Sequence, residues 1–372
     1  MKTLVIAEKP SVARDIARVL GCAKKENGAL EGNQYIVTWA LGHLVTLKDP
    51  EDYDKKYKEW NMAVLPMMPE KLQIKVIPQT GKQYHAVTTQ LARKDVGEVV
   101  IATDAGREGE LVARWILDKA HNQKPCKRLW ISSVTDKAIR EGFASLKDAK
   151  EYDNLYRAAV SRAEADWLVG INATRALTCK YNAQLSCGRV QTPTLAMIAQ
   201  REQEIREFVP KPYYTVTAAA GGAVYTWKDE KSGGTRISDP EKAKQIAEKA
   251  KRYPLVLQKV EKKKKQKEAP LLYDLTELQR DASARFGYSA KQTLNLMQSL
   301  YETHKVLTYP RTDSRYLTKD IVPTLKERLD AVSIGPYKAL AQQAKRSPLN
   351  GKLSFVNDAK VSDPHALIPT EQ

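Results

Sequence analysis

The sequence has few cysteines and no long apolar run. Its four cysteines form no C-x-x-C pair, and no histidine stands at zinc-ligand spacing from them: Cys22, Cys126, Cys179 and Cys187. The pattern therefore indicates neither a disulfide framework nor a zinc site, and it favours a reducing cytoplasm. The apolar run at residues 4–7 is too short for a signal peptide, and no stretch approaches the length of a membrane helix, so we expect no membrane partner.

The sequence is also poor in negative charge relative to positive charge. It has 61 Lys and Arg against 44 Asp and Glu, which gives a net charge of +17 and a pI of about 9.5. A surface of this kind is suited to a polyanion, and nucleic-acid binding by it would depend strongly on salt. Charge alone does not decide the matter, because many basic proteins bind no nucleic acid. No G-x-x-x-x-G-K-[ST] loop is present, so no nucleotide cofactor is expected.

The first 150 residues alternate between strand and helix patterns, which predicts a parallel α/β sheet. Residues 2–7 and 97–103 are expected to be buried strands. Pro10 begins an apolar-periodic segment that Gly21 closes, as is typical of a helix. The 372 residues are enough for two or three domains with cores of their own.

The rest of the chain reads as mainly helical. Residues 151–208 are predicted to be helical with a break near Gly188, and prolines then indicate a boundary near Lys211. Residues 213–227 alternate like two strands around a Gly-Gly turn, and residues 255–260 are also strand-like. Residues 259–269 form a charged connector whose lysine run is usually a solvated segment and less often a DNA contact.

Several carboxylates lie where a parallel sheet would gather them. Glu8 follows the first strand, Asp104 follows a later one, and Glu108 and Glu110 fall on the first turn of the next helix. Carboxyl ends of parallel strands meet at one edge, where α/β active sites form. A few carboxylates with water and phosphate oxygens suit Mg²⁺. The alternative is that acidic residues merely favour a helix amino terminus through its dipole.

A tyrosine motif stands far downstream, at residues 306–314. Tyr309 is followed by Pro310 and Arg311, and Arg315 lies close by. Fixed cations near a phenol favour its ionised form, so Tyr309 could attack a phosphodiester while arginine holds the developing charge. Tyrosines between helices are more often packing residues. His365 is one of five histidines and could donate to a phosphate, although a lone histidine is more often structural.

These segments, in this order, resemble the type IA DNA topoisomerases, and among them the bacterial topoisomerase III enzymes. Residues 8–11 and 103–110 look like the two signatures of the Toprim domain in that family. Residues 161–170 and 188–195 look like its single-strand-binding helical domain. Residues 272–279 and the tyrosine motif look like its nucleophile domain. The resemblance covers essentially the whole chain.

The resemblance implies a multidomain α/β plus mainly α fold. The expected parts are a Toprim domain at 1–150, the first part of the helical single-strand-binding domain at 151–211, a gate segment with β-strands at 212–270, and a helical nucleophile domain at 271–372. The family's toroid normally returns through the gate and single-strand domains after the nucleophile domain. The fold is therefore expected to be incomplete at its carboxyl end, and strand passage by these residues alone is expected to be impaired.

The resemblance also implies roles for single residues. Tyr309 would attack one strand of single-stranded or underwound DNA and keep its 5′-phosphate, so religation would need no ATP. Glu8 would move a proton at the 3′-hydroxyl, Lys9 and Arg311 would stabilise the phosphate in the transition state, and His365 would assist. Glu8, Asp104 and Glu108 would hold Mg²⁺. The single strand would be positioned by Arg162, Asp166, Arg189 and Gln191.

One departure affects the expected metal site. The family's acidic triad commonly reads Asp-x-Asp-x-Glu, and Gly106 stands at its middle position here. The loss of a carboxylate predicts weaker Mg²⁺ affinity, offset by Glu110 or by DNA phosphates.

Two alternative functions remain open at this point. A DNA-binding fragment without catalytic turnover would keep the basic groove, and its DNA binding would not change when Tyr309 is replaced by phenylalanine. A Toprim primase or nuclease would explain Glu8 and Asp104 but leaves Tyr309 without a role. We expect an enzyme of the cytoplasm, associated with the nucleoid.

Overall fold

The computed structural model describes residues 1–132, 134–361 and 364–371. Its contacts divide the chain into two compact units. One contains Met1–Arg189 together with Pro270–Gln372, and the other contains Val190–Ala269. The second unit is thus an insertion in the sequence of the first.

A seven-stranded sheet forms the centre of the first unit, with the strand order β2-β3-β4-β1-β7-β8-β9. Its central strands run parallel: β4 (Tyr35–Trp39), β1 (Lys2–Ala7), β7 (Val96–Ala102) and β8 (Cys126–Arg128). The outer strands pair antiparallel: β2 (Lys24–Glu26) and β3 (Ala29–Glu31) on one side of the sheet and β9 (Lys147–Asp148) on the other. Strands β5 (Val45–Leu47) and β6 (Ile74–Val76) form a separate pair. The parallel α/β sheet predicted for this region is confirmed.

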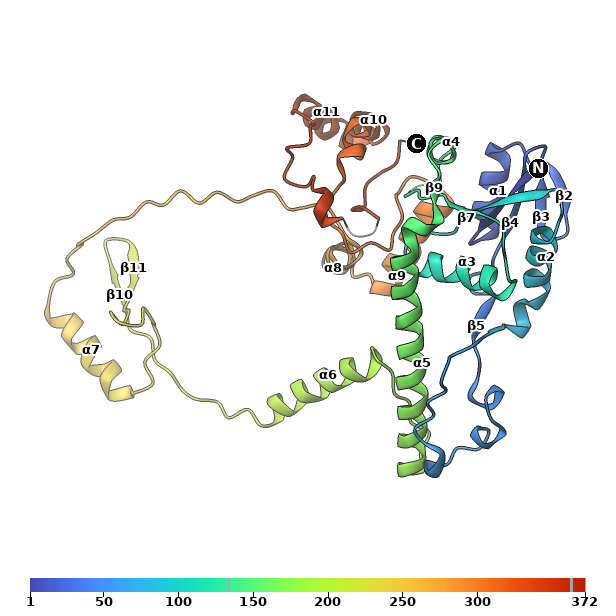
Figure 1. The fold of residues 1–372 in the computed structure, drawn as a ribbon. Helices are drawn as coiled ribbons and strands as arrows, with labels where there is room; N and C mark the ends of the chain where they lie inside the picture. The colour runs from blue at the N-terminus through green and yellow to red at the C-terminus, as the bar shows by residue number, and fades with distance from the viewer. Residues whose placement is uncertain (133, 362–363, 372) are drawn as a thin grey trace. The chain divides into compact units, whose positions relative to one another are not determined.

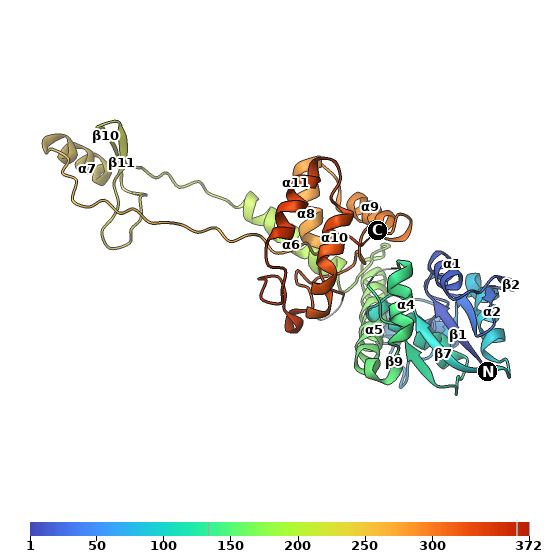
Figure 2. The same cartoon turned by 90° about the horizontal axis from the view of Figure 1, so that it is seen from above.

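Helices cover both faces of this sheet (Figures 1 and 2). Along β1, Val5 and Ala7 pack into one buried cluster with α1 (Pro10–Val19) and α4 (Asp136–Ala144). Leu4 and Ile6 point the other way, into a cluster with α2 (Gly81–Leu91) and α3 (Arg107–Lys119). Successive side chains of a strand alternate between faces, so a fully apolar strand requires this double cover.

Local signals set the ends of these helices, and the start and end predicted for the first helix are confirmed. Pro10 is the first residue of α1, and Gly21 after its end has a φ of 71°. The side chain of Thr135 accepts a hydrogen bond from the amide of Ala138 and so caps α4.

The long helix α5 (Asp153–Tyr181) packs against α3. The helices of the carboxyl-terminal part are α8 (Leu275–Phe286), α9 (Ala290–Glu302), α10 (Leu325–Ala331) and α11 (Lys338–Arg346). Helices α8 and α9 contact each other, as do α10 and α11, which lie side by side in Figures 1 and 2. Short 3₁₀ helices span Pro50–Asp52, Lys55–Tyr57, Met62–Val64, Pro78–Thr80, Ala149–Tyr152, Lys319–Thr324, Gly335–Tyr337 and Asp358–Lys360.

The second unit contains α6 (Gln191–Arg206), strands β10 (Thr217–Ala220) and β11 (Ala223–Thr226), and α7 (Pro240–Arg252). The two strands pair antiparallel, and Gly221 and Gly222 between them have φ values of 58° and 76°. Positive φ at both turn positions is the reason glycine occurs there. The predicted hairpin is confirmed.

The strand predicted for residues 255–260 is wrong. These residues form no strand, and the side chains of Leu255, Val256 and Leu257 are 53%, 75% and 68% exposed. An apolar, β-branched segment becomes a strand only where a neighbouring strand accepts its backbone hydrogen bonds, and no strand pairs with this one. Within the described residues, no helix combines the length and the apolar character needed to cross a bilayer.

Candidate active site

Glu8 and Asp104 meet at the carboxyl edge of the central sheet. Strands β1 and β7 are parallel neighbours, and the register that pairs Ala7 with Ala102 brings the two following segments together. The backbone amide of Asp104 donates to Oε2 of Glu8 over 3.2 Å. The sequence prediction that these two carboxylates emerge at one edge is therefore confirmed.

Burial raises the pKa of both carboxyl groups. The pKa of Glu8 rises to about 7, first because the group is buried and second because of the negative charge of Asp104. Burial also raises the pKa of Asp104, against the opposing effect of the Lys9 ammonium. Two buried carboxylates this close hold excess negative charge, and a cation would relieve it.

Lys9 connects this edge to the carboxyl-terminal part of the chain. Its Nζ lies 3.8 Å from Oδ2 of Asp104 and forms an ion pair with Glu302 at the end of α9. Burial works to lower the pKa of Lys9, but the charges of Asp104 and Glu302 outweigh it and the pKa is raised. Lys9 therefore stays charged beside the carboxylates.

Tyr309 contacts the segment that follows strand β8. Its backbone amide donates to the carbonyl oxygen of Ser132 over 2.9 Å. Its ring, half-buried, contacts the ring of Tyr301 edge-on, with the centroids 5.5 Å apart. Tyr301 is fully buried in the cluster that also contains α1 and α4 residues, and burial raises its pKa well above the usual value. Tyr301 is thus a neutral packing partner for Tyr309.

His365 lies beside the same segment and is neutral. Its Nδ1 is 2.7 Å from the carbonyl oxygen of Ala366, and its Nε2 is 3.0 Å from the hydroxyl of Ser132. A carbonyl only accepts, so Nδ1 carries the proton and Nε2 accepts from Ser132. Burial lowers the pKa of His365, in agreement with a neutral ring.

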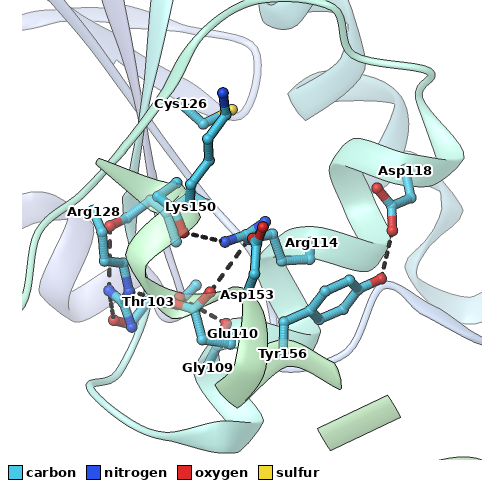
Figure 3. A network of polar contacts seen from close by, with 12 residues as sticks. Thr103, Gly109, Glu110, Arg114, Asp118, Cys126, Arg128, Lys150, Asp153 and Tyr156 are labelled. Atoms are coloured by element: carbon cyan, nitrogen blue, oxygen red, sulfur yellow. Dashed lines mark hydrogen bonds and ion pairs between the residues drawn. The ribbon is translucent and has the colours of Figure 1, made fainter. Parts of the chain in front are cut away.

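The other two acidic residues do not join Glu8 and Asp104. Glu108, which is half exposed, lies 3.6 Å from Nε2 of His43 and 3.2 Å from Arg162, and the contact with His43 is the main cause of its lowered pKa. Glu110 is fully buried and bound to Arg128 and Arg114 (Figure 3). Glu110 is therefore not free to replace the carboxylate missing at Gly106.

The described residues contain no ready-made group of three or more metal-ligating side chains. The pair formed by Glu8 and Asp104 nevertheless fits a hard divalent cation. Both donors are buried carboxylates with raised pKa values, at an edge that Lys9 neutralises only in part. Mg²⁺ commonly uses one or two carboxylates and completes its shell with water and phosphate oxygens.

A groove of about 680 Å³ begins next to this edge. It is lined in part by His43, Trp115, Arg162, Asp166, Trp167 and Arg311. Asp166 also binds Nε of Arg189 over 2.5 Å. The structure thus brings together three of the predicted DNA-binding residues and the arginine of the tyrosine motif. Gln191 is the first residue of α6 and belongs to the second unit.

Sequence reasoning missed several residues of this site. His43 had a visible signal, because histidines are few, but nothing in the sequence pairs it with Glu108. Glu302 and Ser132 come close to the site only through the tertiary fold. Arg128 looks like an ordinary strand residue in the sequence, and the structure buries it completely.

Family models match nearly the whole chain. Residues 3–134 match the Toprim domain, a domain that binds divalent metal, and residues 150–372 match a family described as DNA topoisomerase. The DNA topoisomerase 3 of Shouchella clausii is 64% identical to this chain over 373 residues, and that of Bacillus subtilis is 61% identical over 371. In both cases the match covers 100% of this chain and 51% of the relative, so the chain spans about half the length of these curated relatives.

A solved structure supports the same fold. The full-length topoisomerase I of Thermotoga maritima superposes with a TM-score of 0.62 at 24% sequence identity, covering 88% of this chain and 52% of that one. The expectations of a Toprim domain, of an incomplete multidomain fold and of a likeness to topoisomerase III are confirmed.

Proposed function

The chain belongs to the type IA family of DNA topoisomerases, and from this premise we propose that it carries the cleavage centre of an ATP-independent enzyme. This centre cuts one DNA strand through Tyr309, allows another strand to pass and reseals the cut, so that negative supercoils are relaxed or linked DNA is separated. We place the reaction in the cytoplasm, at the nucleoid.

The observation that carries this proposal is that the sheet contacts both the tyrosine motif and the end of α9, the latter through the lysine beside the carboxylate edge. Tyr309 binds the Ser132 carbonyl through its amide, and Lys9 bridges Asp104 and Glu302. Residues about 200 or more positions apart in the sequence are thereby gathered around one small region. A packing tyrosine alone would not require two buried carboxylates and a lysine beside it.

In the proposed cleavage step, the phenolic oxygen of Tyr309 attacks the phosphorus of a DNA phosphodiester and loses its proton to solvent. The bond from phosphorus to the 3′-oxygen breaks, and Glu8 gives its proton to that oxygen. Lys9 and Arg311 stabilise the extra charge on the phosphate, and His365 supports the site through Ser132. Religation reverses these steps, and the phosphotyrosine ester conserves the energy of the broken bond.

We propose Mg²⁺ as the divalent cation, held by Glu8 and Asp104 with Glu108 at the rim. When bound, the ion would offset the negative charge of the phosphate. The raised pKa values of Glu8 and Asp104 support a site that gains from a cation. The single strand would run along the groove near Arg162, Asp166 and Arg189, and Gln191 is proposed to take part. The net charge of +17 supports an anionic polymer as the partner.

The experiment that tests this proposal is covalent capture of labelled single-stranded oligonucleotide. The chain is mixed with the oligonucleotide and Mg²⁺ and denatured quickly, with the label at the 5′ end in one sample and at the 3′ end in the other. Because Tyr309 would keep the downstream fragment, only the 3′-labelled strand should become protein-linked. The adduct should disappear in Tyr309→Phe, with binding nearly unchanged. An adduct with the 5′ label would contradict the proposed polarity.

A second candidate is a single-stranded-DNA-binding fragment without turnover. It is favoured by the exposure of large apolar side chains on α6, including Leu195, Met197 and Ile198 at 66%, 64% and 57%, and by the coverage of about half of each curated relative. Tight, salt-sensitive binding with no adduct from either label would support this candidate.

A further inference from the structure

Arg128 is a fully buried cation directly beneath the loop that carries Asp104. Its side chain has no solvent exposure. Its guanidinium donates hydrogen bonds to four backbone carbonyl groups. These are the carbonyls of Ile101, at 3.2 Å, and of Thr103, Leu129 and Asp104, at 2.7 Å each. Its Nε binds Oε1 of Glu110 over 2.5 Å. All three nitrogens of the guanidinium thus donate, and three of the four carbonyls belong to residues 101–104.

The position of these carbonyls explains what the arginine does locally. Strand β7 ends at Ala102, and the chain leaves the sheet at Thr103 and Asp104 before α3 begins at Arg107. Carbonyl groups at such an exit lose their ladder partners, and a buried carbonyl without a partner is costly. Arg128 supplies partners for the carbonyls of Thr103 and Asp104 and so fixes the backbone from which the Asp104 carboxylate projects.

A second set of contacts holds the same loop against the first turn of α3. The hydroxyl of Thr103 donates to the carbonyl of Gly109 over 2.8 Å. A Cβ atom at Gly109 would lie 2.0 Å from the carbonyl oxygen of Asp104, so only glycine permits this approach. The loop therefore has one conformation, set by Arg128 on one side and Gly109 on the other.

Glu110 connects Arg128 to the long helix α5 through Arg114. Figure 3 shows Glu110 lying between Arg128 and Arg114. Arg114 is 3.3 Å from Oε2 of Glu110, and it donates to Asp153 over 3.0 Å and to the carbonyl of Ala149 over 2.5 Å. Arg114 thus contacts the start of α5 and the 3₁₀ helix before it.

We propose that Arg128 and Glu110 form a positioning pair for the divalent-cation site: Arg128 holds the Asp104 loop in its cation-binding conformation, and Glu110 holds Arg128. The pair itself does not touch the cation. The inference rests on the metal site of the proposed function. Residues that orient metal ligands typically change metal affinity about 10- to 100-fold when they are replaced.

The test measures metal binding by the 372-residue chain without DNA. Mn²⁺ serves as the probe, because free Mn²⁺ is read directly by electron paramagnetic resonance. Arg128→Lys cannot reach four carbonyls, and Glu110→Gln keeps the shape of the side chain but not its charge. Both variants should bind Mn²⁺ about 10-fold or more weakly, while metal-free binding to a single-stranded oligonucleotide stays within about twofold. Arg175→Lys, at a buried arginine of α5 that donates to the carbonyl of Tyr57, is the matched control and should bind Mn²⁺ like the wild type.

The outcomes separate the possible failures. Circular dichroism and thermal melting first establish that each variant folds. Folded variants that bind Mn²⁺ like the wild type would overturn the positioning role. If both Arg128→Lys and Glu110→Gln fail to fold while Arg175→Lys folds, the pair is purely structural and the proposal is also wrong. If the wild type itself binds no Mn²⁺, the metal site of the proposed function fails, and covalent capture by Tyr309 tests the rest of that function independently.

Discussion

Gly106 leaves space for the carboxylate that the acidic motif lacks. It stands just before α3 with a φ of 175°, an extended conformation open to any residue, and an added Cβ would meet no atom within 4 Å. An aspartate here would add negative charge next to Asp104 and favour a divalent cation.

We therefore predict that Gly106→Asp lowers the Mg²⁺ concentration for half-maximal adduct formation about 10-fold, since affinity follows the number of charged ligands. A titration of covalent capture against Mg²⁺ measures this, with Gly106→Asn as the uncharged control. The wild type should require the higher concentration, because it has one carboxylate fewer. Saturation of the wild type at very low Mg²⁺ would contradict this.

His365 makes folding sensitive to mild acid. Its pKa is lowered in the folded state because the ring is buried, so the unfolded state takes up a proton first. The stability of the fold should accordingly fall as the pH drops below about 6.5, the ordinary pKa of histidine.

His365→Gln removes this titration. Between pH 7 and pH 5, the melting temperature of the wild type should fall further than that of His365→Gln. His304→Gln, at an exposed position, is the control and should follow the wild type. Parallel curves for all three proteins would show that protonation of His365 does not affect folding.

Among elements, strand β3 ends in a charge cluster that connects it to the start of β1 and to Arg93. Glu31 at its end binds Arg93 over 2.7 and 3.2 Å and also pairs with Lys2 at the start of β1. These hydrogen bonds lower the pKa of Glu31 to about 2, with Arg93 as the largest cause.

A lowered carboxyl pKa stabilises the fold above the unfolded value of about 4.5, and this stability is lost as the pH falls toward 2. We predict that Glu31→Gln lowers the free energy of unfolding by about 1 to 3 kcal/mol at pH 7, the usual contribution of hydrogen bonds to charged groups. Denaturant titrations at pH 7, 5 and 3.5 should show the difference narrowing below pH 4.5. A constant difference would mean that the charge of Glu31 is not involved.

The elements with local signals were predictable from the sequence. The turn at Gly221 and Gly222 and the cap at Thr135 each depend on residues adjacent in the chain. The apolar segment at residues 255–260 has the composition of a strand, yet whether it forms one depends on a partner that composition cannot supply. Strands β2 and β3 were not predicted, because three polar or small residues carry too little alternation.

In the candidate site, too, some residues could be predicted from the sequence and others could not. Glu8 and Asp104 could be placed together because parallel strands share an edge, a rule that needs no side-chain detail. The roles of Arg128, Ser132 and Glu302 depend on contacts across more than one element, and a sequence pattern does not encode such distances. Glu108 illustrates the limit, since its helix turn was predicted and its partner His43 was not.

At the scale of the whole molecule, cleavage and strand passage make different demands. The proposed cleavage step would need the contacts around Tyr309, which lie within one compact unit. Passage needs a gate that opens and closes around a second strand, and the chain matches about half of each curated relative.

We predict that the 372-residue chain forms the 3′-labelled adduct with Mg²⁺ but does not fully relax negatively supercoiled plasmid. Agarose gel electrophoresis of plasmid at matched protein concentration measures this, and Tyr309→Phe controls for contaminating activity. Complete relaxation by the purified chain would contradict the prediction.

The insertion of residues 190–269 into the sequence of the first unit affects how that unit could be assembled. Its two segments, 1–189 and 270–372, hold each other through non-covalent contacts such as those of Lys9 with Glu302 and of Ser132 with Tyr309 and His365. Residues 190–269 connect the two segments along the chain, and their last part, residues 254–269, is exposed and forms no helix or strand. After a protease cut there, these contacts would still hold Tyr309 in the first unit, and two separately made polypeptides divided at this point should reconstitute the proposed cleavage centre.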